Sequence, residues 1–319
     1  MMGSFLDAAF FALSVTLPSI LLLVLGWYLR RSGQVDLKFC DQASKIVFNY
    51  SMPALLFFSI YANQSDMSEQ LNLILAGFVS SVALFIGAEI IARLKVKDVR
   101  DQGVFVQGVY RANTMIMGLA FVSSAYGAPG VAMGAVYGGA MTLLYNILAV
   151  ITLSRASATD GKFHPMLMVR QIVTNPLIIA IVLALVAKGL QVPVSPLLAE
   201  TGRYLAVIAL PLALICAGAT LDLRSLFKVS DVSLWSSLGR LFVAPLAAIA
   251  AGIAFGLEGT AMGVLFLMTA TPVAAASYVM AKAMGANDVA AANIVGLTTI
   301  GAMPVAAVGI AGLRMMGWM

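Results

Sequence analysis

Long apolar stretches separated by short polar connections dominate the sequence. About 20 apolar residues are enough to cross the hydrocarbon core of a bilayer as a helix, and ten stretches reach roughly that length. They span residues 8–29, 43–62, 71–92, 103–126, 130–153, 166–188, 202–221, 232–256, 260–283 and 288–313. The pattern therefore predicts an all-α integral membrane protein with ten transmembrane helices.

The composition supports this interpretation. Hydrophobic residues make up 61% of the 319 residues and charged residues only 10%, and the mean hydropathy is +0.98. A water-soluble fold of this length could not cover so much apolar surface. The lipid bilayer is therefore the expected partner of most of the surface.

The basic residues are unevenly placed along the chain. Fourteen lie in or beside the five odd-numbered connections between predicted helices, and three lie near the opposite ends. Because basic connections stay in the cytoplasm, we expect both termini on the outer side of the cell inner (plasma) membrane. The same alternation argues against reading the net charge of +5 as a nucleic-acid surface.

Shifting the sequence on itself by 158 positions aligns distant prolines. Pro18 meets Pro176, and Pro53 meets Pro211. One register without gaps serves several distant segments, which indicates an internal repeat.

The two repeats, residues 1–158 and 159–319, hold five predicted helices each. An odd number of helices means that the second repeat enters the membrane upside down. Inverted repeats are typical of secondary transporters, whose binding sites lie near the membrane midplane where helices are broken. Channels and structural proteins can also be repetitive, so the repeat favours transport without proving it.

Polar residues interrupt the fourth and ninth predicted helices at equivalent positions. In the repeat register, Asn113 of "RANT" aligns with Thr271 of "TATP". Both residue types are good helix N-caps, and Pro272 follows at the position where a helix best tolerates proline. We therefore expect both helices to be broken and to cross at mid-membrane, with half-helices at 103–112, 114–126, 260–270 and 272–284.

Such breaks suit an anion, in particular a carboxylate. The start of each second half-helix offers free backbone N–H groups and the positive end of a helix dipole. Arg111 would add a full positive charge beside Asn113 and Thr114. Two other interpretations stay open: Asn113 marks a plain kink, or Arg111 pairs with a neighbouring carboxylate or carbonyl and serves structure alone.

A few other polar residues lie within the apolar stretches. Glu89 and Arg93 are one helical turn apart and predict a local ion pair. Arg240 enters the membrane from the same side and could also meet Glu89, which would form a gate or a coupling pair. Tyr145 and Asn146 could line a cavity, although aromatic packing explains the tyrosine equally well.

Five segments together identify a family resemblance. They are MPALLF (52–57), RANTMIMGLA (111–120), NPLIIAIVLAL (175–185), LPLALICAGATL (210–221) and TPVAAASYVMAKAMG (271–285). In this order, and over nearly the whole chain, they resemble the auxin efflux carrier family in its bacterial branch. The resemblance implies a fold like that of bile-acid–sodium symporters. Predicted helices 1, 2, 6 and 7 would form a scaffold domain that also mediates homodimerisation, and helices 3–5 and 8–10 a transport domain.

The resemblance also implies a mechanism and a site. It implies organic-anion transport by an elevator movement, with Asn113 binding the substrate carboxylate and Asn146 lining the pocket. The chain departs from plant members, because Thr114 and Met115 follow Asn113 where a proline is usual. A small bacterial carboxylate is therefore a better expected substrate than auxin.

We expect a secondary transporter of small organic anions. A sodium-coupled symporter of the same fold is an alternative, but sodium sites favour carboxylate oxygens. Apart from Glu89, the interiors of the predicted helices hold no acidic residue, which favours uniport or proton-linked movement. A membrane receptor or sensor that binds without transport is a further alternative, against which the lack of a soluble output domain counts.

Other function classes lack their residues. An enzyme needs a nucleophile–base pair or metal ligands. The chain has one histidine and two separated cysteines, Cys40 in a predicted connection and Cys216 in a predicted helix. No G-x-x-x-x-G-K-[ST] phosphate loop for ATP is present. We expect no enzymatic activity, no metal, no cofactor and no nucleic-acid partner.

Overall fold

A computed structural model describes residues 2–62, 67–153, 170, 173–221 and 230–319. This part of the chain is helical and holds no β-strand, only one isolated β-bridge. The α-helices are α1 (Met2–Arg31), α2 (Leu37–Ile46), α3 (Met52–Ala62), α4 (Met67–Lys95), α5 (Val99–Tyr110), α6 (Leu119–Leu153), α8 (Pro176–Gly189), α9 (Pro196–Thr220), α10 (Asp231–Leu238), α11 (Ala244–Ala254), α12 (Gly259–Thr269), α13 (Ala276–Ala283) and α14 (Asp288–Met315). The π-helical turns are η1 (Val47–Ser51), η2 (Thr114–Gly118) and η5 (Gly239–Val243). The all-α prediction is confirmed, and the expected repeat boundary at residues 158 and 159 lies outside the described residues.

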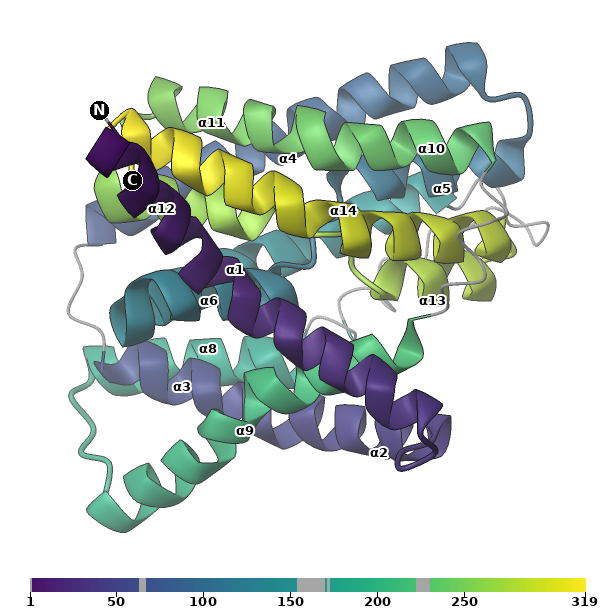
Figure 1. The fold of residues 1–319 in the computed structure, drawn as a ribbon. Coiled ribbons are helices and arrows are strands. Elements are labelled where there is room, and N and C mark those ends of the chain that lie inside the picture. The colour runs from purple at the N-terminus through teal and green to yellow at the C-terminus, as the bar shows by residue number, and fades with distance from the viewer. Residues whose placement is uncertain (1, 63–66, 154–169, 171–172, 222–229) are drawn as a thin grey trace.

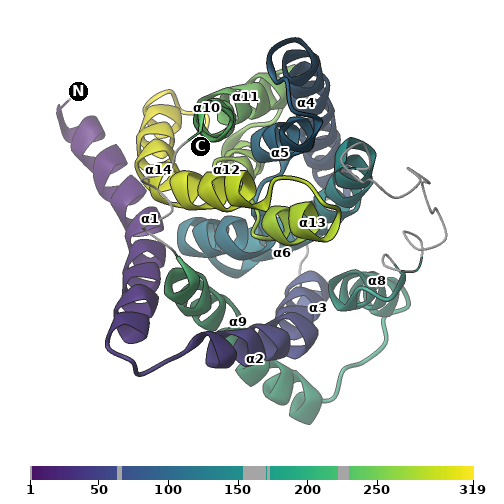
Figure 2. The same ribbon diagram turned by 90° about the vertical axis from the view of Figure 1, so that its right-hand side faces the viewer.

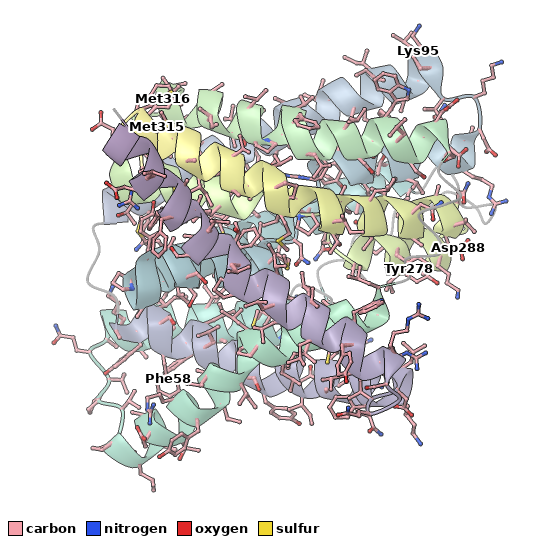
Figure 3. The ribbon with its side chains drawn as sticks, viewed as in Figure 1. Phe58, Lys95, Tyr278, Asp288, Met315 and Met316 are labelled. Atoms are coloured by element: carbon pink, nitrogen blue, oxygen red, sulfur yellow. The ribbon has the colours of Figure 1, made fainter. Side chains whose placement is uncertain are left out.

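The helices form two groups that lie side by side (Figures 1 and 2). The first group consists of α2, α3, α8 and α9, and the second of α4–α6 and α10–α14, with α6 facing the first group. Helix α1 packs against α9 of the first group and α14 of the second. The two termini lie at one end of the molecule (Figure 1), and Lys95 and Asp288 lie at the other (Figure 3).

Several of these helices are long and apolar enough to cross a membrane. Within the described residues there are seven: Leu6–Arg31, Leu37–Ala62, Gln70–Lys95, Thr114–Leu153, Pro196–Thr220, Asp231–Ala254 and Asp288–Met315. The shorter α8 and α12 are also apolar. Large apolar side chains such as Phe10, Ile90 and Leu183 are exposed, as expected where lipid covers the surface. These are the features of a multi-pass membrane protein.

The helix bounds differ from the predicted stretches in several places. The second half of the fourth stretch and the whole of the fifth lie in one helical run, α6, which turns at Gly127, where a φ of 59° and a ψ of −149° suit glycine. The second stretch begins at Leu37, because the Asp36 carboxylate accepts a hydrogen bond of 2.7 Å from the amide of Phe39 and caps α2. Cys40 therefore lies in a helix and not in a connection. The ninth stretch is interrupted, as predicted, and forms α12 and α13.

Two of the π-helical turns end just before a proline. Turn η1 ends two residues before Pro53, and η5 ends two residues before Pro245. Proline has no N–H to continue the α-helical ladder, and its ring clashes with the carbonyl one turn earlier. A wider turn at this point accommodates the proline. The turn η5 also holds Arg240, which is buried.

Helices α1 and α9 cross closely through two glycines. A Cβ atom at Gly26 would overlap the carbonyl oxygen of Ile215, and one at Gly218 would overlap that of Leu23. Because backbone cannot move aside as a flexible side chain does, only glycine fits at these two positions. Small residues at such crossings allow membrane helices to pack backbone to backbone.

Candidate functional site

The two interruptions predicted from the sequence lie against each other. The amide of Asn113 donates a hydrogen bond of 2.9 Å to the carbonyl of Pro272, and the amide of Ala274 donates one of 3.1 Å to the carbonyl of Arg111. Between them, Ala112 and Val273 form an antiparallel β-bridge. Backbone groups that the breaks would leave unpaired in an apolar environment are thereby satisfied.

Asn113 stands at the start of η2, but its side chain does not cap that turn. The first bond of the turn runs from the amide of Gly118 to the carbonyl of Asn113 at 3.0 Å, which is the wider π-helical spacing. The Asn113 side chain is partly exposed and forms no hydrogen bond within the described part of the chain. The expected N-cap role is therefore wrong for Asn113, and its amide group is left available. Thr114, the next residue, is buried in the first turn of η2.

Thr271 is not an N-cap either. Its hydroxyl donates to the carbonyl of Met268 at 3.2 Å, within the turn that precedes it. Helix α13 begins only at Ala276, whereas the sequence predicted residue 272. The intervening segment is held in place by a hydrogen bond of 3.0 Å from the amide of Val273 to the Thr298 hydroxyl, in addition to the bonds with the first interruption.

Arg111 is 5% exposed and lies where α5 ends. Its guanidinium donates to the backbone carbonyl of Tyr145 at 3.2 Å and to the side-chain oxygen of Asn146 at 2.7 Å, both on α6. The Tyr110 hydroxyl donates to the same Tyr145 carbonyl at 3.4 Å. The structure thus brings together Arg111, Tyr145 and Asn146, which the sequence named separately. Within the described residues no carboxylate lies within 4.0 Å of this guanidinium.

Arg240 lies beside the same paired interruptions and approaches them from α10 and η5. Its guanidinium donates to the carbonyls of Val109 at 3.1 Å and Tyr110 at 3.0 Å, and to the carbonyl of Thr269. These carbonyls belong to the C-terminal ends of α5 and α12. The hydrogen-bond acceptors of the Arg240 guanidinium are therefore backbone carbonyls of α5 and α12, and the expected contact with Glu89 stays a prediction.

Glu89 belongs to a different cluster. It accepts a hydrogen bond of 2.6 Å from the Thr152 hydroxyl and lies 3.6 Å from Nε of Arg93. The local ion pair predicted from the one-turn spacing is therefore present. A gating or coupling role for Glu89, Arg93 and Arg240 stays a prediction.

Two residues beside the paired interruptions could not be assigned from the sequence. The sequence shows that Arg240 is a charged residue within an apolar stretch. Its partners are backbone carbonyls, which no residue pattern reveals. For Thr298 the sequence offers one weak signal, the pair Thr298–Thr299 in the middle of an apolar helix.

A large groove lies between the two helix groups. Its volume is about 1210 Å³, and it separates α1, α3 and α9 from the first part of α6. Pro18, Phe58 and Pro211 line one wall, and Ser123 and Ser124 the other. Phe58 is labelled in Figure 3. The binding residues predicted from the sequence are not among its lining residues, so the groove and the paired interruptions are distinct places.

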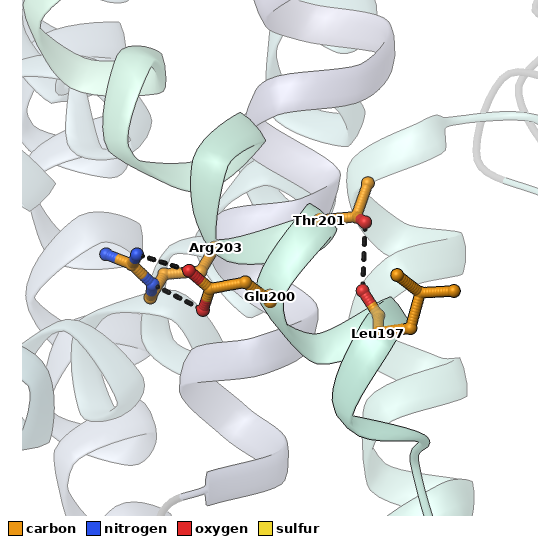
Figure 4. A network of polar contacts seen from close by, with 4 residues as sticks. All are labelled: Leu197, Glu200, Thr201 and Arg203. Atoms are coloured by element: carbon orange, nitrogen blue, oxygen red, sulfur yellow. Dashed lines mark hydrogen bonds and ion pairs between the residues drawn. The ribbon is translucent and has the colours of Figure 1, made fainter.

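Among the described residues that line the groove, Arg203 is the charged one. Its guanidinium binds the carboxylate of Glu200 through two hydrogen bonds of 2.9 and 2.6 Å (Figure 4). One turn away, the Thr201 hydroxyl donates to the carbonyl of Leu197 at 2.9 Å. The charge of Arg203 is thus already balanced, unlike that of Arg111.

Paired helix interruptions within a bundle of apolar helices place the chain in a class, the helical multi-pass membrane proteins with interrupted helices. A family model described as "Membrane transport protein" matches residues 11–158 and 162–310. The chain belongs to this family, the auxin efflux carrier family of membrane transport proteins.

One relative supports the assignment. The chain is 27% identical over 273 residues to a protein of Methanothermobacter thermautotrophicus described as an uncharacterized transporter. The match covers 83% of this chain and 87% of that relative. The chain is therefore a membrane transporter and not an enzyme, and the family resemblance of the five sequence segments is confirmed.

Proposed function

We propose that the protein is a secondary transporter of small organic anions, and that it binds the substrate carboxylate at the paired interruptions. This proposal rests on one observation. The backbone hydrogen bond between Asn113 and Pro272 lies beside two buried guanidinium groups, those of Arg111 and Arg240. Among the described residues neither guanidinium has a carboxylate partner.

The electrostatics of this place favour an anion. Arg240 faces the C-terminal ends of α5 and α12, whereas the Arg111 guanidinium has only neutral acceptors within the described residues. A buried positive charge without a counter-ion is costly in a low-dielectric interior, and a carboxylate bound beside Arg111 reduces that cost. The Asn113 side chain is available to donate to a carboxylate oxygen. Thr114, Tyr145 and Asn146 would complete the site, with Thr271 and Pro272 contributing backbone from the second interruption.

The two helix groups suggest how substrate moves. We infer an inverted repeat of five plus five transmembrane helices in which helices 4 and 9 cross. The transport domain is the second helix group, α4–α6 and α10–α14. It slides as an elevator against a scaffold of α1, α2, α3, α8 and α9. The groove between α3 and α6 supports this division, because it lies along the proposed sliding surface. The scaffold would also form a homodimer, in the inner (plasma) membrane with both termini outside.

Two alternatives make different demands. A sodium-coupled symporter needs oxygen ligands for the ion, and the carboxylate of Glu89 is engaged by Thr152 and Arg93 away from the interruptions. We therefore favour uniport or proton-linked movement. A receptor or sensor would bind the same anion without moving it, which a transport assay separates.

The first test is thermal stabilisation of the detergent-purified protein by a panel of small carboxylates, with and without sodium. A ligand that binds only the folded state raises Tm in a concentration-dependent way. Asn113→Ala is compared with Asn49→Ala, the same change at an exposed position of the scaffold. We expect one class of carboxylate to stabilise the wild type and Asn49→Ala, but not Asn113→Ala, and to do so equally with or without sodium.

Other outcomes change the proposal. Sodium-dependent stabilisation would favour the symporter. Equal stabilisation of all three proteins would place the site elsewhere and reduce Asn113 to part of a kink. Binding without uptake into proteoliposomes would favour the receptor.

A further inference from the structure

Arg240 is the most deeply buried charge at the crossing. It is 1% exposed and has no carboxylate partner among the described residues. Its partners are the last carbonyls of two helices that approach from opposite directions, Val109 and Tyr110 of α5 and Thr269 of α12. One side chain thereby joins both interrupted helices.

The charge of these helix ends explains why a cation stands there. The C-terminal end of a helix carries roughly half a negative charge on its unpaired carbonyls. Two such ends that converge inside a membrane protein repel each other unless a positive charge lies between them. In secondary transporters, ends of this kind coordinate a sodium ion or a proton.

The surrounding backbone brings Arg240 to this position. Pro245 is preceded by the wide turn η5, which contains Arg240. Gly239, the residue before it, allows close approach to α5, because a Cβ there would lie 3.0 Å from a methyl group of Val109. One turn earlier, the Ser236 hydroxyl donates to the carbonyl of Phe105 at 2.8 Å. This helix is therefore bonded to α5 along two successive turns.

We propose that Arg240 is a permanent internal cation of the crossing and fills the place where a coupling cation would otherwise bind. A guanidinium cannot dissociate from the chain and stays charged at every physiological pH. The two helix ends are therefore held together without any ion from solution. This inference rests on the proposed function only for its consequence, which is that transport needs no sodium ion at this place.

The test is to replace the side chain with a free cation. Arg240→Ala removes the charge and leaves three carbonyls around a cavity. We expect its Tm to fall by roughly 5–15 °C. Guanidinium chloride at low millimolar concentration should then recover about half of this loss in a saturable way. Sodium chloride, potassium chloride and choline chloride at equal ionic strength show whether a simple ion can also take the place.

Ser236→Ala is the matched control. It removes a hydrogen bond between the same helix and α5 but no charge, so it should lower Tm without any dependence on the cation. The wild type should also be indifferent to all four salts. The proposal is overturned if no cation stabilises Arg240→Ala more than it stabilises Ser236→Ala.

A second pair keeps the test decisive if Arg240→Ala does not fold. Arg240→Lys keeps the charge, and Arg240→Gln keeps most of the size without it. We expect guanidinium or sodium to stabilise Arg240→Gln but not Arg240→Lys. If Arg240→Gln is as stable as the wild type in every salt, the proposal is wrong. None of these measurements uses an organic anion, so failure of the carboxylate panel and failure of this inference are separate results.

Discussion

The guanidinium of Arg111 donates a hydrogen bond of 2.7 Å to the side-chain oxygen of Asn146. This hydrogen bond holds the charged side chain at the end of α5 against α6. A guanidinium has five N–H donors, and Arg111 uses two of them in hydrogen bonds within the described residues. The side chain can therefore be held in place and still donate to a bound anion.

The first prediction concerns this pair. Asn146→Ala removes a hydrogen bond to a charged group, which is worth about 1.5–3 kcal/mol. We expect weaker binding of the stabilising carboxylate, because Arg111 loses its orientation. Arg111→Ala should weaken binding further, and in that background Asn146→Ala should cost less affinity than it does in the wild type. Dissociation constants for all four proteins measure the coupling between the two residues.

Thr142→Ala is the control for this cycle. Thr142 lies one turn before Asn146 on α6. Its hydroxyl donates a hydrogen bond of 2.7 Å to the carbonyl of Gly138 on the same helix, which carries no charge. We expect unchanged affinity. Strictly additive effects of Arg111→Ala and Asn146→Ala would show that Asn146 does not act through Arg111.

The second prediction concerns Thr298, whose hydroxyl accepts the amide of Val273 at 3.0 Å. Thr298→Val keeps the shape but leaves a buried N–H without an acceptor, which costs about 1–3 kcal/mol. Thr298→Ser should retain the bond. Thr299→Val is the control, because that hydroxyl bonds only to Val295 of its own helix. Melting temperatures in detergent should fall for Thr298→Val alone, and equal losses at both positions would contradict the assigned role.

The third prediction concerns the crossing of α1 and α9. Gly218→Ala places a methyl group against the carbonyl of Leu23, and overpacking of this kind costs about 1–3 kcal/mol. We expect a lower Tm. Gly312→Ala, where nothing lies within 4 Å of the added atom, should be neutral or slightly stabilising, because alanine favours a helix by about 1 kcal/mol over glycine. A Gly218→Ala variant as stable as Gly312→Ala would mean that the two helices can separate freely.

The sequence was sufficient for the class of fold and for the places of the two interruptions. The length of each apolar stretch follows directly from the order of residues in the sequence. Asn113 and Pro272 stand out in these stretches as a polar residue and a helix-breaking residue. The bounds of the second half-helices were not predictable in the same way. Helix α13 begins four residues late, because Val273 and Ala274 are bonded to Thr298 and Arg111, which lie far away in the sequence.

The roles of the two buried arginines show the same limit. Sequence spacing correctly paired Glu89 with Arg93, because both lie on one helix. It could not assign Arg240, whose partners are backbone carbonyls of two other helices. Backbone groups are present at every position, so only the tertiary fold shows which of them a side chain reaches.

The last prediction tests the elevator movement. Ser59 of α3 and Ser124 of α6 line opposite walls of the groove. In a background with Cys40 and Cys216 replaced by alanine, we introduce cysteines at both positions and join them with maleimide linkers of graded length. If α6 slides against α3, short linkers should abolish counterflow of the stabilising carboxylate in proteoliposomes while its binding remains, and longer linkers should restore counterflow progressively.

Cysteines at Ser59 and Ala206, which line the same groove within the scaffold, are the control and should be linked without loss of transport. Full transport by a completely linked Ser59–Ser124 pair would rule out sliding at this surface, because a short covalent bridge cannot follow a rigid-body displacement of one wall.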